Sequence, residues 1–295
     1  MSDLYGFDAY SPSEIAARVE NVGVAKAHFP LVSQVMLSML AGGFIGLGAL
    51  YFTLVTSDAT LGFALSRVLG GLVFSLGLVL VVVAGAELFT GNNLLAMAWA
   101  EGKLTTGDVL ANWVVVCLAN FVGAAGLALL VFLSGHLGMN GGAVGMQAVR
   151  IAAGKVALSL PEAFLRGVLC NILVCMAVWM AFAGRSVTDK AIAIVFPISA
   201  FVAAGFEHSV ANMYFLPLAW LQQTFAPVSL PGADAIDIVH ILRNLAVVIL
   251  GNIVGGSVLV ALVYHLIYRR GAKEAAAKTP RPPIGGAGPT GPNQA

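Results

Sequence analysis

The chain has 295 residues, of which 59% are hydrophobic and only 10% are charged, and its mean hydropathy is +0.92. A soluble domain carries about 25% charged residues, so this chain has too few charges to cover a globular surface of its size. The composition excludes an ordinary cytosolic enzyme, a nucleic-acid-binding protein and a disordered chain, and it indicates a membrane protein. The net charge of +1 identifies no partner.

The N-terminal segment 1–30 opens with Asp3 and Asp8 instead of the basic residues of a signal peptide, and no apolar run follows. It instead predicts an amphipathic helix over 11–29, in which Ser11 caps the first turn, Pro12 follows and Glu14 completes a capping box. An apolar stripe continues at helical spacing through Ile15, Val19, Val22, Ala25 and Phe29. We expect this helix to lie on the membrane surface or beneath a helical bundle.

Six apolar runs with few charges are long enough to cross the hydrocarbon core, which takes about 20 residues. Their ranges are 31–56, 68–100, 109–135, 162–184, 191–221 and 240–268. We therefore predict an all-α membrane protein whose six-helix pore domain extends over 31–270. The remainder, 271–295, is rich in Pro, Gly and Ala, and we expect it to be a disordered cytoplasmic tail.

Six spans place both termini on one side of the membrane. If that side is the cytoplasm, it holds 10 of the 15 Lys and Arg residues, which favours cytoplasmic termini, although five of the 10 lie beyond the last span. Three of the outer cations, Arg150, Lys155 and Arg166, cluster between the third and fourth spans, against the usual bias.

The second and fifth runs are each interrupted by ionisable residues in a shared pattern. Ala84, Gly85, Glu87 and Asn92 recur 120 positions later as Ala204, Gly205, Glu207 and Asn212. An Asn-x-x-Gly motif also recurs, at Asn120 and Asn252. Because each half holds three spans, duplicated halves must have inverted topology, which is typical of transport folds with broken helices. We therefore predict that each interrupted run is broken into two half-helices, and that a pore lies near the midplane between the repeats.

His208 is the main candidate for chemistry because it lies beside the second break at membrane depth. An imidazole titrates near neutral pH and can exchange a proton with a weak acid, whereas the alternative is a structural histidine bonded to backbone. We expect Glu207 to point away from the pore, because adjacent side chains diverge. Glu87 and Glu207 are then expected to brace the broken backbone together with Asn92 and Asn212.

The sequence leaves two interpretations open for Asn171, Asn252 and Lys155. Asn171 and Asn252 either donate to an anion or to His208, or hold two helices together. Lys155 either attracts anions on the outer side or is a solvated loop residue. Thr90 and Ser209 are candidates to cap the half-helices. Four apolar residues near the breaks either form hydrophobic gates or only pack, namely Phe74, Leu78, Phe89 and Phe201.

Several chemistries lack a motif in the sequence. Cys117, Cys170 and Cys175 lie in apolar runs and indicate buried thiols instead of disulfides or metal ligands. There is no phosphate-binding loop and no metal-ligand spacing, so we expect no enzyme, no cofactor and no metal site. The alternative classes are an intramembrane enzyme using His208 and Glu207, which lacks a nucleophile, and a neutral-solute channel, for which the Asn-Pro-Ala pairs of aquaporins are missing.

Four segments together resemble the formate/nitrite transporter family: 88–92, 169–175, 205–214 and 251–256. The resemblance extends from about residue 15 to residue 270. It implies an aquaporin-like six-helix protomer that assembles as a pentamer in the inner (cytoplasmic) membrane, with one pore per protomer. It also implies transport of small monovalent anions of weak acids: formate, nitrite, hydrosulfide, acetate or lactate. The run 211–217 looks more like the formate-type members.

The resemblance also implies a role for individual residues. His208 matches the central pore histidine, Thr90 the pore-facing threonine and Lys155 the outer lysine. The match extends to pore or support asparagines at Asn171 and Asn252, to one constriction at Leu78 and Phe89, and to another at Phe74 and Phe201. The resulting hypothesis is pH-dependent, proton-linked passage of formate through a pore centred on His208. Nitrite, hydrosulfide or a neutral solute is the alternative substrate.

Overall fold

The computed structural model describes residues 9–270, and every regular element in this range is a helix. Six helical segments within it are long and apolar enough to cross a membrane: Leu31–Thr56, Phe63–Ala84, Thr106–Leu133, Leu160–Ala183, Val187–Ala204 and Ile238–Arg270. This finding confirms the predicted all-α architecture with six spans. The tail predicted at 271–295 lies outside the described residues.

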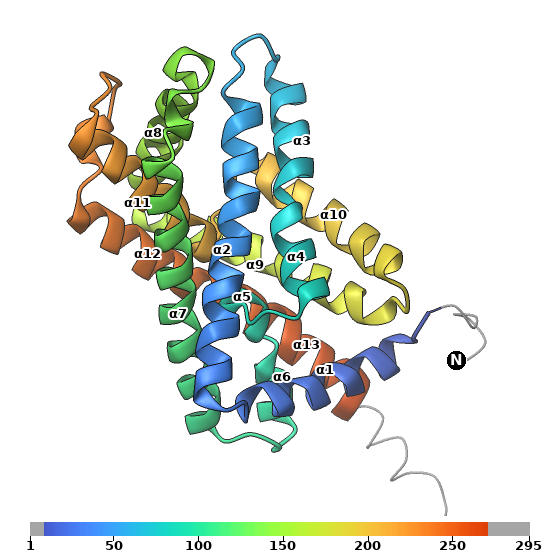
Figure 1. Cartoon of the computed structure of the whole chain (residues 1–295). Coiled ribbons are helices and arrows are strands. Elements are labelled where there is room, and N and C mark those ends of the chain that lie inside the picture. Colours follow the sequence, from blue (N-terminus) through green and yellow to red (C-terminus); the bar gives the residue numbers. More distant parts are fainter. Residues whose placement is uncertain (1–8, 271–295) are drawn as a thin grey trace, which may run out of the picture.

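In Figure 1 the axes of α2, α3 and α7 are roughly parallel, with α3 antiparallel to α2 along the chain, and α10 and α12 cross them. Their bounds are α1 Pro12–Ala27, α2 Leu31–Thr56, α3 Phe63–Phe74, α4 Leu76–Ala84, α5 Phe89–Asn92, α6 Leu95–Ala100, α7 Thr106–Leu133, α8 Ala143–Val156, α9 Leu160–Ala183, α10 Val187–Ala204, α11 Ser209–Phe225 and α12 Ile238–Ile253. The last span continues as a π-helix over Val254–Leu262, then as α13 (Val263–His265) and a second π-helical turn over Leu266–Arg270.

A glycine ends the helix before each predicted break. α4 ends at Ala84 and α10 at Ala204, and the next residues, Gly85 and Gly205, have φ angles of +80° and +75°. Residues with a Cβ adopt this left-handed conformation at a cost, so glycine is the residue that ends a helix here. After the non-helical linkers 85–88 and 205–208, α5 and α11 begin. The prediction of two half-helices in the second and fifth runs is confirmed.

The repeated Asn-x-x-Gly motif brings two pairs of spans into close contact. α2 packs against α7, and α9 packs against α12 and the π-helix that follows. A Cβ at Gly123 would clash with the carbonyl oxygen of Met39, and one at Gly255 with that of Val168. Small residues allow backbones to approach this closely in membrane helices.

The N-terminal helix α1 lies across one end of the bundle (Figure 1) and packs against α6 and α9. The predicted capping box is present, because Ser11 accepts from the Glu14 N–H and Glu14 accepts from the Ser11 N–H. The buried face differs from the predicted stripe: Phe29 is 37% exposed, whereas Glu20 is fully buried. Glu20 fits there because Lys103 and Arg269 bind its two carboxylate oxygens at 2.9 and 2.6 Å.

Helix α8 (Ala143–Val156) occupies the stretch between the third and fourth spans, where the sequence interpretation expected only a loop. The helix was missed because it is too short to span a membrane. Its buried residues, which include Val144, Ala148 and Ala152, recur every four positions, and α8 packs against α11. Its last turn carries Lys155.

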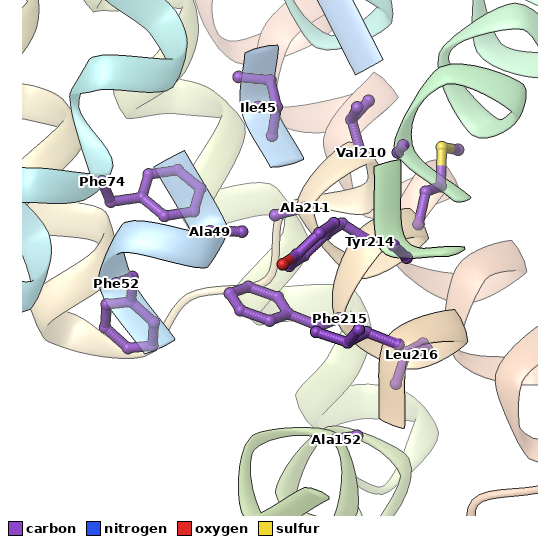
Figure 2. Close-up of a cluster of buried hydrophobic side chains, with 14 of the residues drawn as sticks. Ile45, Ala49, Phe52, Phe74, Ala152, Val210, Ala211, Tyr214, Phe215 and Leu216 are labelled. Atoms are coloured by element: carbon purple, nitrogen blue, oxygen red, sulfur yellow. The ribbon is translucent and has the colours of Figure 1, made fainter. Parts of the chain in front are cut away.

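An aromatic cluster joins α2, α3 and α11 in the core (Figure 2). The ring of Phe52 makes edge contacts with Phe74 and Phe215, with centroids 6.4 and 6.0 Å apart. Tyr214 lies beside them and is fully buried. This packing fixes the half-helix α11 against the first two spans, so the residues at the start of α11 are held in place.

Candidate functional site: two cavities and a buried histidine

Two cavities of about 330 Å³ each approach the broken helices. The first, here the Lys26 cavity, is lined by α1 and by the linker before α5, and its walls include Lys26, Leu78 and Glu87. The second, here the Lys155 cavity, is lined from α8 and from the linker before α11. Phe74 of the Lys155 cavity and Leu78 of the Lys26 cavity are four residues apart on one span, so the two linings approach within about one helical turn.

His208 lies in the wall of the Lys155 cavity at the start of α11 and is 2% exposed. Its Nδ1 accepts the backbone N–H of Ala211 at 3.0 Å, which caps the half-helix. Because Nδ1 is an acceptor, the hydrogen-bond network assigns the ring proton of the neutral imidazole to Nε2. Nε2 lies 3.0 Å from the hydroxyl of Thr90, and the ring stacks on Phe201 at a centroid distance of 5.7 Å.

The caps expected at Thr90 and Ser209 are wrong. α5 follows Leu88, an apolar residue that offers no side-chain acceptor, and α11 follows His208. An asparagine on a neighbouring helix accepts the free N–H instead: Asn120 from Phe89, and Asn252 from Ser209, both at 2.9 Å. The Thr90 hydroxyl therefore does not cap α5 and instead bonds to His208.

Each of these two asparagines also donates to the backbone of the linker before its half-helix and to the backbone of another helix. The Nδ2 of Asn120 donates to the carbonyls of Ser38 and Glu87, and that of Asn252 donates to those of Gly167 and Glu207. Asn252 therefore joins two helices and a linker, and none of its bonds goes to His208.

Asn171 sits on α9 and is fully buried. Its Nδ2 donates to the carbonyls of Thr90 and Asn252 and to the side chain of Asn93, at 3.2, 2.7 and 2.7 Å. Its Oδ1 has no hydrogen-bond partner among the described residues. The amide donors of Asn171 hold the backbone at the Thr90 break, and they do not contact His208.

Both breaks carry the same ion-pair network. Lys155 binds Glu207 at 2.9 Å, and Lys26 binds Glu87 at 3.0 Å. The second oxygen of each glutamate accepts from an asparagine of its own half-helix, Asn212 at 2.7 Å or Asn92 at 2.8 Å. Each Glu–Asn pair is therefore hydrogen-bonded at its break.

A second pair of asparagines, Asn244 and Asn112, completes the two networks. Each accepts from the asparagine of its half-helix, Asn212 or Asn92, at 2.8 and 3.0 Å. Each also donates to the backbone carbonyl of the lysine in its own network, Lys155 or Lys26, at 3.0 and 3.3 Å. The two breaks are therefore held by equivalent residues, as a duplicated structure requires.

One prediction about the second network is corrected, and one of the two interpretations of Lys155 is excluded. Glu207 does not point away from His208 but lines the Lys155 cavity beside it, because the linker 205–208 is not helical and the Glu207 carboxylate reaches towards Lys155. Lys155 is not a solvated loop residue: its side chain is 13% exposed and lies on the last turn of α8.

Sequence reasoning missed Lys26, Asn112 and Asn244. A signal was present, since Asn112 and Asn120 recur as Asn244 and Asn252, 132 positions on, with the same spacing of eight residues. This spacing places both amides on one face of a helix, so the repeat extends to the partners of the half-helix asparagines. The sequence held no equivalent signal for Lys26, because the two lysines lie at different distances from their glutamates.

The four candidate constriction residues are all buried but do not lie together. Phe74 and Phe201 make an edge contact with centroids 5.8 Å apart, and both line the Lys155 cavity. Leu78 lines the Lys26 cavity, and so does Leu88. Phe89 is 1% exposed and lies in neither lining.

The comparisons with known proteins agree with this architecture. The model of the family described as "Formate/nitrite transporter" matches residues 13–266. The "Formate channel FocA" of Escherichia coli (strain K12) is 39% identical over 274 residues, which cover 90% of this chain and 96% of that protein. The "Formate channel FocB" of the same strain is 36% identical over 279 residues, covering 92% and 99%.

A solved structure described as "Pentameric formate channel with formate bound" has the same fold. It is 38% identical, has a TM-score of 0.74, and covers 81% of this chain and 97% of that one. The chain belongs to the formate/nitrite transporter family.

Proposed function

We propose that the protein conducts small monovalent anions of weak acids, formate above all, across the inner (cytoplasmic) membrane. We further propose that it acts as a homopentamer with one pore per protomer. One observation carries the proposal: a buried histidine, bonded to Thr90, lines one of two cavities that each contain a lysine–glutamate pair. The relatives named formate channels and the related pentamer that holds formate support the same substrate and assembly.

The two lysines are placed to attract anions into the cavities. Lys155 has three N–H donors, and its bond to Glu207 uses one of them. The ammonium also faces the ring of Phe215, 5.5 Å from the centroid. An anion in the Lys155 cavity therefore meets a cation with unused donors, and an anion in the Lys26 cavity meets the equivalent residue of the other network.

The apolar region around Phe74, Leu78 and Phe201 is a barrier for a charged species. Moving a bare monovalent ion into a medium of low dielectric constant costs of order 20 kcal/mol in an idealised estimate. The neutral acid avoids most of this cost. We therefore propose that the anion crosses together with a proton and is close to neutral in the barrier.

His208 is the group best placed to associate the proton with the anion. Its Nε2–H faces Thr90, and a hydrogen bond from this N–H to the bound anion stabilises the anion as it loses water. Protonating Nδ1 would remove the acceptor of the Ala211 N–H, so the imidazole is held neutral as a donor. The bound anion takes its proton from hydronium in the cavity water, so formate becomes formic acid while the imidazole stays neutral and keeps its Nε2–H.

We place both termini in the cytoplasm and assign the chain no catalytic reaction. α1 and the last described turn lie on the same side of the bundle, joined by the 2.6 Å contact between Arg269 and Glu20. The excess of Lys and Arg on that side supports a cytoplasmic position. Around His208 the bonded groups are a backbone N–H and a threonine hydroxyl, which suits a hydrogen-bond donor to a solute passing through.

Flux measurements in proteoliposomes test this function. Formate, nitrite, acetate, hydrosulfide and glycerol are offered separately, with and without a pH gradient. We expect formate uptake that rises when the outside is more acidic than the inside. Passage of glycerol without passage of any anion would contradict the proposal and favour a neutral-solute channel.

A further inference from the structure

The two cavities differ strongly in charge. Four cations line the Lys155 cavity with one carboxylate, a net charge of +3 with His208 neutral, whereas the Lys26 cavity has two cations and one carboxylate, a net charge of +1. The excess comes from Arg67, Arg150 and Arg166, which converge from α3, α8 and α9. Two of them belong to the cluster of outer cations that runs against the usual charge bias of membrane proteins. Because the three arginines line one cavity, their charges act together on a solute in it.

The three arginines keep donors that the protein itself does not use. The Nε of Arg67 donates to the carbonyl of Ala203 at 2.8 Å, and one Nη of Arg150 donates to the side chain of Gln147 at 2.9 Å. The side chain of Arg166 makes no hydrogen bond within residues 9–270. Since each guanidinium has five N–H donors, most of them remain free for a ligand.

The acidic groups nearby do not neutralise this cluster. Glu207 is the single carboxylate in the lining, and its two oxygens are bound by Lys155 and Asn212. Glu162 lies one turn before Arg166, but it is exposed, does not line the cavity, and its carboxylate accepts from the N–H and hydroxyl of Ser159 at 3.0 and 2.7 Å. The cavity therefore offers a positive potential to solutes.

We propose that Arg67, Arg150 and Arg166 form a binding subsite for small dianions such as dicarboxylates, and that an occupied subsite inhibits formate passage. The inhibition, though not the binding, rests on the proposed function. Guanidinium groups match carboxylates in two-point hydrogen bonds, and a dicarboxylate offers a second carboxylate to a second arginine. A dianion also interacts about twice as strongly as formate with the same positive potential.

A bound dianion blocks the pore because it occupies the Lys155 cavity and is unable to cross the apolar barrier that formate crosses. The cost of moving an ion into a low-dielectric region grows with the square of its charge, and the Phe74–Phe201 contact lies in the same cavity wall. One proton, which suffices to neutralise formate, leaves a dianion charged. The subsite thus admits a class of anions that the barrier rejects.

Oxalate is a suitable probe for transport. Formate uptake into proteoliposomes is measured at low ionic strength with increasing oxalate on both sides, and sodium chloride of equal ionic strength is the reference. We expect the double variant R150Q/R166Q to need about tenfold more oxalate for half inhibition than the wild type, because two charges near the ligand are lost. Arg67 is left intact because it holds the end of α10.

Arg243→Gln is the matched control. Arg243 lies close to Lys155 in a separate small pocket and is absent from the lining of the Lys155 cavity. The Arg243→Gln variant should respond to oxalate as the wild type does. Equal inhibition of the wild type and the double variant, or no inhibition of either, would overturn the inhibitory subsite.

Calorimetric titration of oxalate into the purified protein tests binding without transport. We expect the wild type to bind oxalate about tenfold more tightly than R150Q/R166Q, with both proteins eluting alike in size exclusion. If formate does not pass but oxalate binding shows this difference, the proposed function fails and the subsite stands. If formate passes and the two proteins bind oxalate alike, the subsite is wrong and the proposed function stands.

Discussion

At the scale of single residues, the contact between Thr90 and His208 links the two halves of the repeat, because each residue belongs to a different broken span. Thr90→Val removes the hydroxyl and keeps a similar volume, so Nε2 of His208 loses its partner in a buried site. We expect the free energy of unfolding to fall by about 1–3 kcal/mol and formate flux to fall with it. Thr90→Ser is the control and should retain both stability and flux. Equal loss in the two variants would show that the methyl group matters and the hydrogen bond does not.

The ion pair between Lys155 and Glu207 gives a second prediction at this scale. Lys155→Met leaves a buried carboxylate unpaired, which costs about 3–5 kcal/mol when a buried pair is broken from one side. The double variant K155M/E207Q removes both charges and should recover most of the thermal stability measured in detergent. It should not recover formate uptake at low formate concentration, because the cation that attracts anions is still missing. Full recovery of uptake would reduce Lys155 to a structural partner of Glu207.

At the scale of helices, Gly123 sets the distance between α2 and α7. An added Cβ there meets the backbone of Met39, whereas one at Gly126, on the same helix, meets no atom within 4 Å. Gly123→Ala should therefore reduce the yield of assembled protein severely, because a backbone atom has no room to move away. Gly126→Ala should be neutral or slightly stabilising, since alanine is the better helix former. Comparable size-exclusion profiles for the two variants would contradict the close-packing argument.

The helices also show how far the sequence predicts this structure. The six spans and both breaks follow from hydrophobicity and from the repeated Ala-Gly-x-Glu pattern, because these are properties of contiguous residues. α8 does not, since its burial depends on contact with α11. For the same reason the orientation of Glu207 was mistaken: the direction of a side chain in a non-helical linker is set by its partner, here Lys155, which is distant in sequence. Asn112 and Asn244 were within reach of the sequence, and comparing the two repeats residue by residue would have found them.

At the scale of the whole molecule, many large apolar side chains point outwards. Residues such as Leu118, Leu130, Phe196 and Val239 are exposed in the single chain, which a membrane protein places against lipid or against other protomers. We expect native mass spectrometry in mild detergent to show five copies, as in the related pentamer. A monomer or a tetramer that dominates in several detergents would contradict the proposed assembly.

The central claim concerns the whole pore: formate crosses together with a proton, and His208 associates the two. His208→Asn keeps a polar side chain at the start of α11, where asparagine is a good helix cap, but this shorter side chain has no donor at the position of Nε2. The decisive measurement is the change of internal pH in proteoliposomes after formate is added, at external pH 5 to 8, with assembly checked by size exclusion. The wild type should acidify the interior most strongly at low external pH, and the assembled variant should lose this proton-coupled signal. An assembled His208→Asn variant that carries protons with formate at the pH dependence of the wild type would contradict the account.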